Sequence, residues 1–407
     1  MIFRKVLLIS FLILFSSLVK AQPGSVQLSS QAEISVITVD PGQEALFTVF
    51  GHSAFRVYDP VNRFDLAYNY GIFSFNQPNF YLNFAKGYLN YMLGVYDFQL
   101  FADQYEPYHR SIYEQVLDLD QEQKQRLFDF LQNNALPENR FYYYDYFYDN
   151  CATKIKDVLK EVLGDNIQFH GGYVTDDRSF RHMVDDLTVY KPWGDFGIDV
   201  CLGLPMDKIM NPEEYMFLPE YIFKGMESAT LASGNGSKPL VKASTQYLDG
   251  GEPIIPNVNL FTPNVVFWSL CIAIGIVSFL GYRKQKIIYT IDVIIFGIIG
   301  LLGLFLLLLW IATDHKAAAN NLNLLWAIPF HFPIAIMLLK KNKHQFLKQY
   351  FFITTCLMLT LLVGWSLIPQ GYNVAFFPII LMLGIRAWYL YFNLNKISNK
   401  TVSHKLA

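Results

Sequence analysis

The sequence predicts an α+β extracytoplasmic domain followed by an all-α transmembrane bundle of about five helices. The first observation behind this is an N-terminal stretch with the composition of a secretory signal. The second is a long polar segment, and the third is a series of apolar runs that begins at residue 264. A helix needs about 20 apolar residues to cross a bilayer. We therefore expect a signal peptide at 1–21, a catalytic domain at 22–227, a linker at 228–263, a membrane domain at 264–393 and a cytoplasmic tail at 394–407.

The first residues are typical of a cleaved signal peptide. Arg4 and Lys5 precede the apolar stretch Val6–Val19, and a small residue, Ala21, ends the segment. The stretch is shorter than the roughly 20 residues of a stop-transfer span, so we expect cleavage after Ala21. Because no cysteine follows this point directly, the protein is not expected to be a lipoprotein itself.

Positive charge predicts the direction of the membrane spans. Lysine and arginine residues follow the first, third and fifth apolar runs, whereas the opposite connections carry Lys316 and little else. By the positive-inside rule, the N-terminal domain lies outside the cytoplasm and the C-terminus inside. The signal peptide requires the same orientation. The five runs cover residues 265–282, 287–312, 322–339, 350–368 and 374–392.

Charge and aromatic content narrow the function classes. The net charge is −2, which gives no indication of a nucleic-acid partner. Aromatic residues make up 16% of the chain, with 26 tyrosines, and seven aromatic or acidic residues follow one another at 142–148. This run fits strand residues in a core and on a surface. It also fits rings that rest at a bilayer interface or along an apolar substrate groove.

The catalytic domain is expected to mix strands and helices. A helix is predicted from Cys151, because Ile155, Val158 and Leu159 recur at helical spacing and Gly164 ends the pattern. Gly51 lies inside a β-rich stretch and suggests a bend or a close backbone approach. Strands are expected over 26–40, 45–58 (as a pair), 64–70 and 98–113, and helices over 79–93 and 120–133.

Cys151 is the leading candidate for a nucleophile. It falls in the first turn of its helix, where free N–H groups and the helix dipole stabilise a thiolate. His52, on a strand, is the natural proton acceptor for this thiol, and Asn69 or Asp65 on the following strand can orient the imidazole. A helix-borne cysteine with a strand-borne histidine and a polar third member is the papain-type arrangement.

Both residues have a plainer interpretation. Cys151 and Cys201 are the cysteines expected outside the membrane, and in an oxidising compartment such a pair can simply form a disulfide. His52 can be a histidine packed in the core. With a disulfide between Cys151 and Cys201, the thiol would be structural and the protein noncatalytic.

Several other polar residues are candidate substrate contacts. Asn150 adjoins the thiol, and Arg178 and Arg181 can contact a lipid phosphate, although a solvated helix face is the favoured explanation of these arginines. Asp314 and His315 lie in an extracytoplasmic loop that would face the catalytic domain. The sequence has neither metal-ligand spacing nor a phosphate-binding glycine loop, so we expect no metal and no cofactor.

The motifs FGHSAFRVYDP, LAYNYGIFSF and YDNCATKIKD, in this order, are similar to those of permuted NlpC/P60 papain-like domains. Together with a multi-span C-terminal region, they more specifically resemble the Lnb family, the lipoprotein N-acyltransferases of Bacteroidota. The likeness covers nearly the whole mature chain, including WGDFGIDVCLGLPMD and TDHKAAANNLNLLW.

The resemblance implies a membrane-anchored acyltransferase at the periplasmic face of the bacterial inner membrane. A phospholipid would donate an acyl chain to Cys151 as a thioester, and the N-terminal amine of a diacylglyceryl lipoprotein would accept it. Two alternatives remain open at this point. One is a periplasmic thiol peptidase or amidase that acts on cell-wall peptides, and the other is a noncatalytic membrane assembly or sensing protein.

Overall fold

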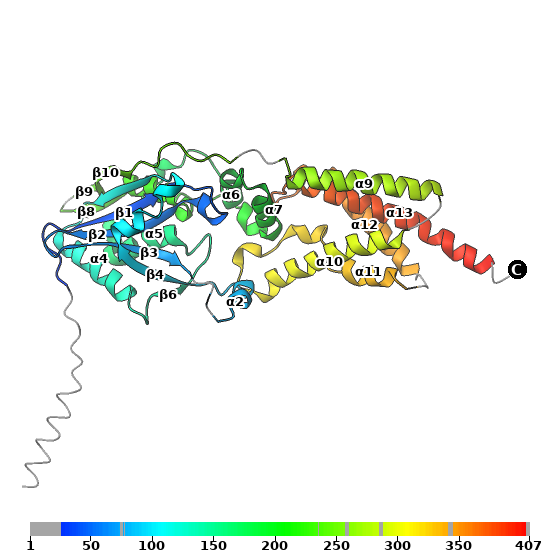
Figure 1. Ribbon diagram of the computed structural model, residues 1–407, viewed down its shortest axis with the longest axis horizontal. Helices are drawn as coiled ribbons and strands as arrows, with labels where there is room; N and C mark the ends of the chain where they lie inside the picture. Colours follow the sequence, from blue (N-terminus) through cyan, green and yellow to red (C-terminus); the bar gives the residue numbers. More distant parts are fainter. Residues whose placement is uncertain are drawn as a thin grey trace, which may run out of the picture.

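The computed structural model describes residues 26–403 except 74, 75, 77, 235, 257–259, 285–287 and 341–344. The expected signal peptide and the end of the expected tail lie outside the described residues. A sheet-rich domain and a helical bundle follow one another along the long axis of the molecule (Figure 1). This is the predicted class, an α+β domain followed by a bundle of membrane-length helices.

One antiparallel sheet organises the N-terminal domain. Its seven strands lie in the order β10-β5-β1-β2-β3-β4-β6, so β2 and β3 are central. A small second sheet joins β7, β8 and β9. The strands of the large sheet are β1 Glu33–Val39, β2 His52–Asp59, β3 Phe64–Ile72, β4 Asn90–Asp97, β5 Ile112–Leu117, β6 Phe141–Tyr143 and β10 Val241–Leu248. The small sheet contains β7 Ile167–Gln168, β8 Thr230–Ser233 and β9 Gly236–Pro239.

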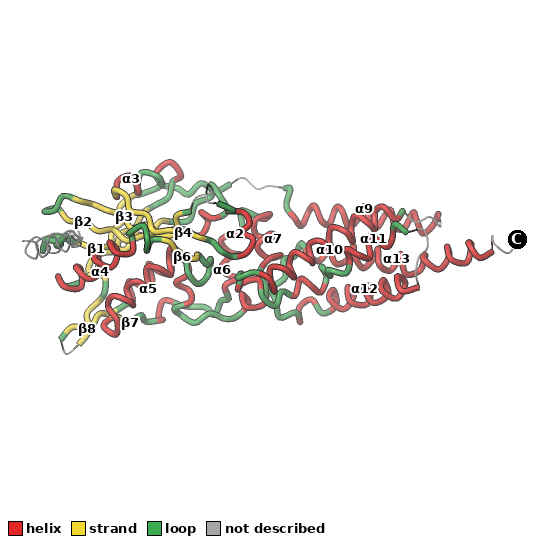
Figure 2. Tube along the Cα trace, turned by 90° about the horizontal axis from the view of Figure 1, so that it is seen from below, coloured by secondary structure: helices red, strands yellow, loops and turns green. Residues whose placement is uncertain are grey.

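Helices cover both faces of the large sheet (Figure 2). On one face, α4 (Gln121–Asn134) and α5 (Cys151–Leu163) pack on the side chains of Phe55 and Tyr68. On the other, α3 (Phe98–Ala102) packs on Ala54 and Ala67. Side chains alternate between faces along a strand, so each central strand contributes to both cores. The predicted helices at 120–133 and from Cys151 are confirmed, with Asp120 as a capping residue.

Some element predictions for this domain were wrong. The expected strand at 98–113 begins with α3, because the Asp97 carboxylate accepts hydrogen bonds from the N–H groups of Gln99 and Leu100 and caps a helix there. A strand, β5, starts only at Ile112, near the end of this range. The first half of the expected strand pair at 45–58 is a 3₁₀ turn, Phe47–Phe50. The expected helix at 79–93 ends at Lys86 as α2 (Phe80–Lys86), since Gly87 closes it in a left-handed conformation.

The expected linker at 228–263 is also largely structured. β8 and β9 form a hairpin, and β10 returns to the edge of the large sheet beside β5. Three further helices, α6 Phe180–Thr188, α7 Pro192–Cys201 and α8 Pro219–Ser228, complete the domain. In Figure 1, α6 and α7 lie between the sheet and the helical bundle.

Within the described part of the chain, four helices are long and apolar enough to span a bilayer. They are α9 Pro263–Lys284, α10 Tyr289–Ala312, α12 Gln345–Val363 and the segment Phe376–Leu394 of α13 (Phe376–Ser403). The third predicted span is not one continuous helix. It consists of a 3₁₀ turn, Leu322–Leu325, and the short helix α11, His331–Leu338, because Pro329 interrupts helical hydrogen bonding between them.

This broken segment still runs back along α10. A Cβ atom on Gly303 of α10 would lie 1.9 Å from the Ala327 carbonyl oxygen, and one on Gly300 would lie 2.1 Å from the Phe332 nitrogen. The later residue of the segment, Phe332, contacts the earlier glycine of α10, Gly300. The broken segment and α10 are therefore antiparallel. Glycine permits the close backbone approach. The bundle thus contains five passes, four of them as long helices.

Ionisable residues inside the bundle have partners. Arg386 of α13 donates two hydrogen bonds to Asp292 of α10, both 2.7 Å long, and a third to Ser278 of α9. His331 and the Tyr350 hydroxyl are 2.6 Å apart. The sequence singles out Asp292 and His331 as unusual in spans. In the structure, each links neighbouring segments of the bundle.

Candidate active site

β2 and β3 bring His52 and Asn69 together on one face of the sheet. Phe55 of β2 pairs with Tyr68 of β3 in an antiparallel register. If the same register is followed to the start of β2, His52 and Asn69 are diagonal neighbours. The His52 Nε2 and the Asn69 Oδ1 atoms are 2.6 Å apart. An amide oxygen accepts hydrogen bonds, so Nε2 carries the proton and Nδ1 remains for another partner.

Gly51 makes this placement of His52 possible. Its φ of 80° is in the region that favours glycine, and a Cβ atom there would lie 2.9 Å from the Val39 carbonyl oxygen. The chain therefore turns from the 3₁₀ segment into β2 at this residue, as its position in the sequence suggests. His52 becomes the first residue of β2 and is paired with Val39 of β1.

Asn150 fixes the start of α5 and hence the position of Cys151. Its Oδ1 accepts hydrogen bonds from the N–H groups of Ala152 and Thr153, at 2.8 and 2.9 Å. Its Nδ2 donates to the carbonyl oxygens of Tyr146 and Phe217, both at 2.8 Å. Asn150 is buried, and both polar atoms of its side chain are used in these bonds. We therefore assign it to positioning Cys151 and not to the substrate contact that the sequence suggested.

Cys151 and His52 are in contact, and each shifts the pKa of the other toward its charged form. Burial opposes ionisation of the thiol, but the charge of His52, a hydrogen bond from His52 and the N–H groups of Ser53 and Ala152 outweigh it and lower the pKa of Cys151. Burial also opposes protonation of the imidazole, yet the Cys151 charge and hydrogen bonds with Cys151 and Asn69 raise the pKa of His52. A lowered thiol pKa beside an imidazole favours the thiolate, which is the nucleophilic form of cysteine.

Gly71, which sequence reasoning missed as part of the site, lies beside Cys151. It sits near the end of β3 with a φ of 93°, and a Cβ atom there would lie 3.5 Å from the Cβ of Cys151 and 3.6 Å from the Tyr144 ring. α5 lies over one sheet face, whereas the His52 ring contacts Phe101 on the other. The small residue at the strand end leaves room for the thiol. The glycine of the AYNYG motif was the signal for this role.

Asp65, the alternative third member, is engaged elsewhere. Its carboxylate accepts two hydrogen bonds from Arg56, at 2.8 and 2.6 Å, and Arg56 also pairs with Glu114. Asp65 lies on the same strand face as Asn69, four residues away, and so the sequence could not separate the two. Contact with His52 selects Asn69.

We expect Asn69→Ala to lower the rate of the thiol chemistry by about tenfold or more, because the imidazole loses the bond that fixes its tautomer and orientation. Asp65→Asn should leave this rate nearly unchanged. The measurement is the initial rate of Cys151 acylation or alkylation in the purified full-length variants. Equal losses in both variants would contradict the assignment of Asn69.

A cavity of about 630 Å³ lies near the start of α5, at the junction between the N-terminal domain and the membrane helices; Asp149 and Lys154 line it, whereas Cys151 does not. Tyr144, whose ring lies near Cys151, is in its wall, and so is Trp310 near the end of α10. Tyr143 and Tyr148 also line it. The tyrosine-rich run thus faces an opening at the membrane side, in addition to its strand role in β6.

Asp314 and His315 line this same cavity. The Asp314 N–H donates to the Lys86 carbonyl oxygen at 3.0 Å. The His315 Nε2 atom lies 3.0 Å from the Phe84 carbonyl oxygen. The loop after α10 therefore contacts the catalytic domain directly, as the sequence predicted. These contacts hold the loop against the turn that follows α2.

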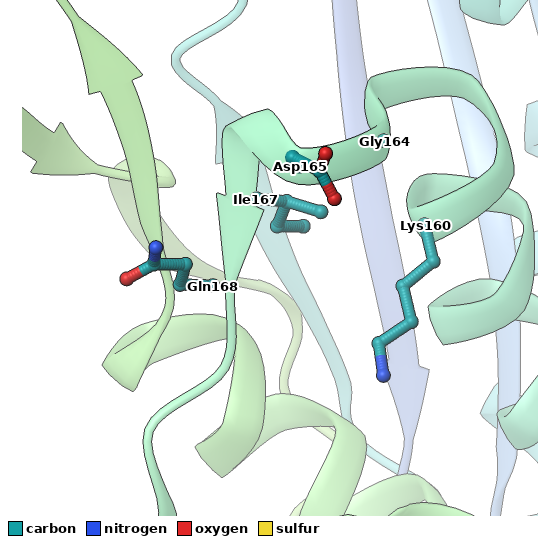
Figure 3. A pocket seen from close by; sticks show the side chains of 5 residues that line it. All are labelled: Lys160, Gly164, Asp165, Ile167 and Gln168. Atoms are coloured by element: carbon teal, nitrogen blue, oxygen red, sulfur yellow. The ribbon is translucent and has the colours of Figure 1, made fainter.

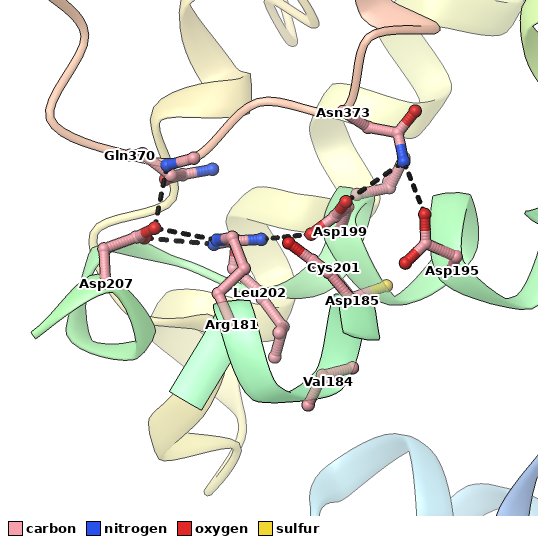
Figure 4. Close-up of polar contacts among 12 residues, drawn as sticks. Arg181, Val184, Asp185, Asp195, Asp199, Cys201, Leu202, Asp207, Gln370 and Asn373 are labelled. Carbon is pink, nitrogen blue, oxygen red and sulfur yellow. Dashed lines mark hydrogen bonds and ion pairs between the residues drawn. The ribbon is translucent and has the colours of Figure 1, made fainter. Parts of the chain in front are cut away.

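Arg181 is not the exposed head-group ligand that the sequence suggested. Its guanidinium is fully buried and pairs with Asp199 at 2.5 Å and with Asp207 at 2.9 Å (Figure 4). Asn373, from the loop between α12 and α13, donates to Asp199 and to Asp195. We call these five residues the Arg181 cluster. It joins the catalytic domain to the membrane domain.

Arg178 lies near the start of the same helix but is partly exposed, and it pairs with Asp186. Arg178 is not part of the Arg181 cluster. It stays at the surface, where Asp186 is its partner. The structure brings Cys151, His52 and Asn69 together, and it places Arg178 and Arg181 outside that group.

The remaining candidate groups do not form a second reactive centre. Cys201 is free, as is Cys151, and burial raises the pKa of Cys201 to about 11, so its thiol stays protonated. Asp185 approaches Asp195 and Asp199 closely. Burial and these carboxylates raise the pKa of Asp185 to about 8, and a protonated acid beside the Arg181 cation is a poor cation ligand. A hollow of about 610 Å³ at the far end of α5, lined by residues such as Lys160 and Asp165, lacks a nucleophilic side chain (Figure 3).

The fold and the site define a membrane protein whose extramembrane α+β domain carries a cysteine–histidine–asparagine triad. Two family models match the chain: the Lnb N-terminal periplasmic domain over residues 27–183 and the Lnb transmembrane domain over residues 255–397. The chain belongs to the Lnb family, and the domain with the triad is periplasmic. Neither a curated protein nor a solved structure matches it.

Proposed function

We propose that this protein is a membrane-anchored cysteine acyltransferase. It moves an acyl chain from a phospholipid, through a thioester on Cys151, to the N-terminal amine of a diacylglyceryl lipoprotein. The observation that carries the proposal is the contact of Cys151, at the start of α5, with His52, which is in turn held by Asn69, close to a cavity that reaches the membrane end of the domain. Membership of the Lnb family is consistent with a lipoprotein-modifying enzyme.

The position of the thiol supports lipid substrates. Both substrates of such a reaction are anchored in a bilayer, and their ester and amine groups lie near its surface. Trp310, close to the end of α10, is the type of residue that marks the membrane interface. The cavity joins Trp310 to Tyr144, which adjoins Cys151. We propose that Asp314 and His315 contact the polar part of a substrate in this cavity.

In the first half-reaction, the Cys151 thiolate attacks the ester carbonyl carbon of the phospholipid. The Cys151 N–H, at the first position of α5, has no acceptor within the helix and is free to donate to the developing oxyanion. The carbon–oxygen ester bond breaks, and His52 gives its proton to the leaving lysophospholipid oxygen. A thioester and a neutral imidazole remain.

In the second half-reaction, the α-amino group of the lipoprotein attacks the thioester carbonyl carbon. His52 takes a proton from the attacking nitrogen, the carbon–sulfur bond breaks, and the thiolate returns. The product carries a third acyl chain in an amide bond. Asn69 keeps the imidazole in one tautomer through both halves.

We also propose the orientation that the charge pattern predicts. The loops after α10 and after α12 contact the periplasmic domain. With five passes, this puts the far loops and the C-terminus on the cytoplasmic side of the inner membrane, where the lysine-rich connections belong. The Cys151 thiol then faces the outer leaflet.

Mass spectrometry of a lipoprotein N-terminus tests the proposed function. A strain without the protein should carry diacylated lipoprotein, and the wild-type gene should restore the triacylated form. Cys151→Ala should restore none, whereas Cys201→Ala, which changes a thiol outside the site, should restore it. Triacylation by Cys151→Ala would disprove the proposal. Cleavage of cell-wall peptides without any change in the lipoprotein would instead identify a thiol amidase.

A further inference from the structure

α2 is a short helix with an unusual surface. It has seven residues, Phe80–Lys86, and none of them is buried. Tyr81 is 79% exposed and Leu82 54% exposed, and Phe84 is exposed as well. A water-facing helix normally presents polar residues, and contiguous exposed apolar side chains mark an interaction site. Ring contacts among Phe80, Tyr81 and Phe84 keep these side chains grouped.

The end of α2 is fixed where α10 leaves the bundle. The Lys86 carbonyl oxygen accepts the Asp314 N–H, and the Phe84 carbonyl oxygen accepts the His315 imidazole N–H. A Cβ atom on Gly87 would lie 3.1 Å from the backbone of Asp314 and of His315, so the two segments are in close contact. Figure 1 shows α2 beside the domain-side end of α10.

That end of α10 defines the depth of α2 relative to the bilayer. α10 stops at Ala312, and Ile311, 66% exposed, and Leu308 belong to its lipid-facing surface. Trp310 in the same turn is typical of the head-group boundary. α2 is bound to Asp314 and His315, the second and third residues after the end of α10, and so it lies at the depth where α10 leaves the bilayer.

We propose that α2 lies in the interfacial layer of the outer leaflet, with Tyr81 and Leu82 inserted among the lipid chains and head groups. The partner is therefore a phospholipid surface. Charge agrees with this partner, since α2 carries the exposed Lys86 in its last turn and no acidic residue. The proposal does not depend on the acyltransferase activity, because it concerns where the helix lies.

Fluorescence of a labelled full-length protein in phospholipid vesicles tests this placement. The label, an environment-sensitive NBD group, is attached to Leu82→Cys or, separately, to Tyr81→Cys. The background carries Cys151→Ala, Cys201→Ala and Cys356→Ala, which remove the two half-buried native thiols and the exposed one. The matched control is Val61→Cys, an equally exposed apolar site (59%) at the opposite end of β2 from His52.

The expected result is a blue-shifted emission at positions 81 and 82, which loses most of its intensity when nitroxide-labelled lipids are included. Aqueous iodide should quench position 61 strongly and positions 81 and 82 weakly. Iodide quenching at 81 and 82 equal to that at 61, without quenching by nitroxide lipids, would overturn the proposal. That outcome would indicate a protein partner for α2. Either result leaves the acyl-transfer proposal to its own mass-spectrometric test.

Discussion

His52→Ala is expected to slow acyl transfer by about 10²–10⁴-fold, the usual contribution of a positioned general acid and base. The residue has two roles in the site. In the proposed mechanism it moves the protons in both half-reactions, and its charge lowers the pKa of the Cys151 thiol. Removing it deletes the largest influence that lowers the pKa of this buried thiol. The variant should therefore lose both the proton carrier and most of the nucleophile.

Alkylation separates the second role from the first. In the wild type, iodoacetamide should modify Cys151 rapidly at neutral pH and more slowly as the pH falls through its lowered pKa. In His52→Ala, burial is no longer offset by a cation, so the pKa rises and rapid alkylation should require alkaline pH. The rate is followed by intact mass in the full-length protein.

His170 provides a matched control for this experiment. Its imidazole lies 2.9 Å from the Thr230 hydroxyl on the surface of the domain, away from the thiol. His170→Ala should retain both the wild-type rate of transfer and the wild-type pH profile of alkylation. An unchanged pH profile in His52→Ala would show that the imidazole does not stabilise the thiolate.

Local patterns were sufficient to predict the placement of Cys151 at a helix start and of His52 on a strand. Cys151 follows a capping residue, and the apolar spacing after it is helical, so its place in the first turn depends on neighbours in the sequence. His52 follows Gly51 in a β-rich stretch. The third member could not be chosen in this way, because Asn69 and Asp65 share a face of β3. Arg56, which binds Asp65, comes from the neighbouring strand.

Predictions failed where distant segments decide the structure. Hydropathy indicates an apolar run at 322–339, but Pro329 and the close approach to Gly300 and Gly303 make it a broken segment. The stretch after α8 contains glycine and proline, as linkers do, yet β5 offers an open edge that β10 completes. Pro329 was a local signal for the break in the first case, whereas the pairing of β10 with β5 has no signal in the local sequence.

Arg181 shows the same limitation for a charged residue. In the sequence TDDRSFRHM, it is indistinguishable from Arg178, and both resemble exposed ligands for a phosphate. Its partners are 18 to 26 residues away in α7 and the turn after it, and the loop that closes over them belongs to the membrane domain. Burial therefore depends on two domains docking together.

This burial makes Arg181→Met one of the most destabilising single changes expected in the protein, by about 3–5 kcal/mol in the free energy of unfolding. The substitution keeps much of the side-chain volume but leaves the carboxylates of Asp199 and Asp207 without their cation. Both carboxylates are largely withdrawn from water, with side chains 5% and 12% exposed. The loss of stability comes mainly from leaving buried carboxylate charges without a partner, and less from losing the contact itself.

Arg178→Met is the matched control, because it removes an arginine–aspartate pair that water reaches. Its cost should be about 0–1 kcal/mol. Thermal unfolding of the detergent-solubilised full chain compares the two variants, and adding Asp199→Asn and Asp207→Asn to Arg181→Met should recover part of the loss. Equal melting temperatures for Arg181→Met and Arg178→Met would contradict the assignment of a buried ion pair. Because the Arg181 cluster does not contact Cys151, the pH profile of Cys151 alkylation should stay unchanged in molecules that remain folded.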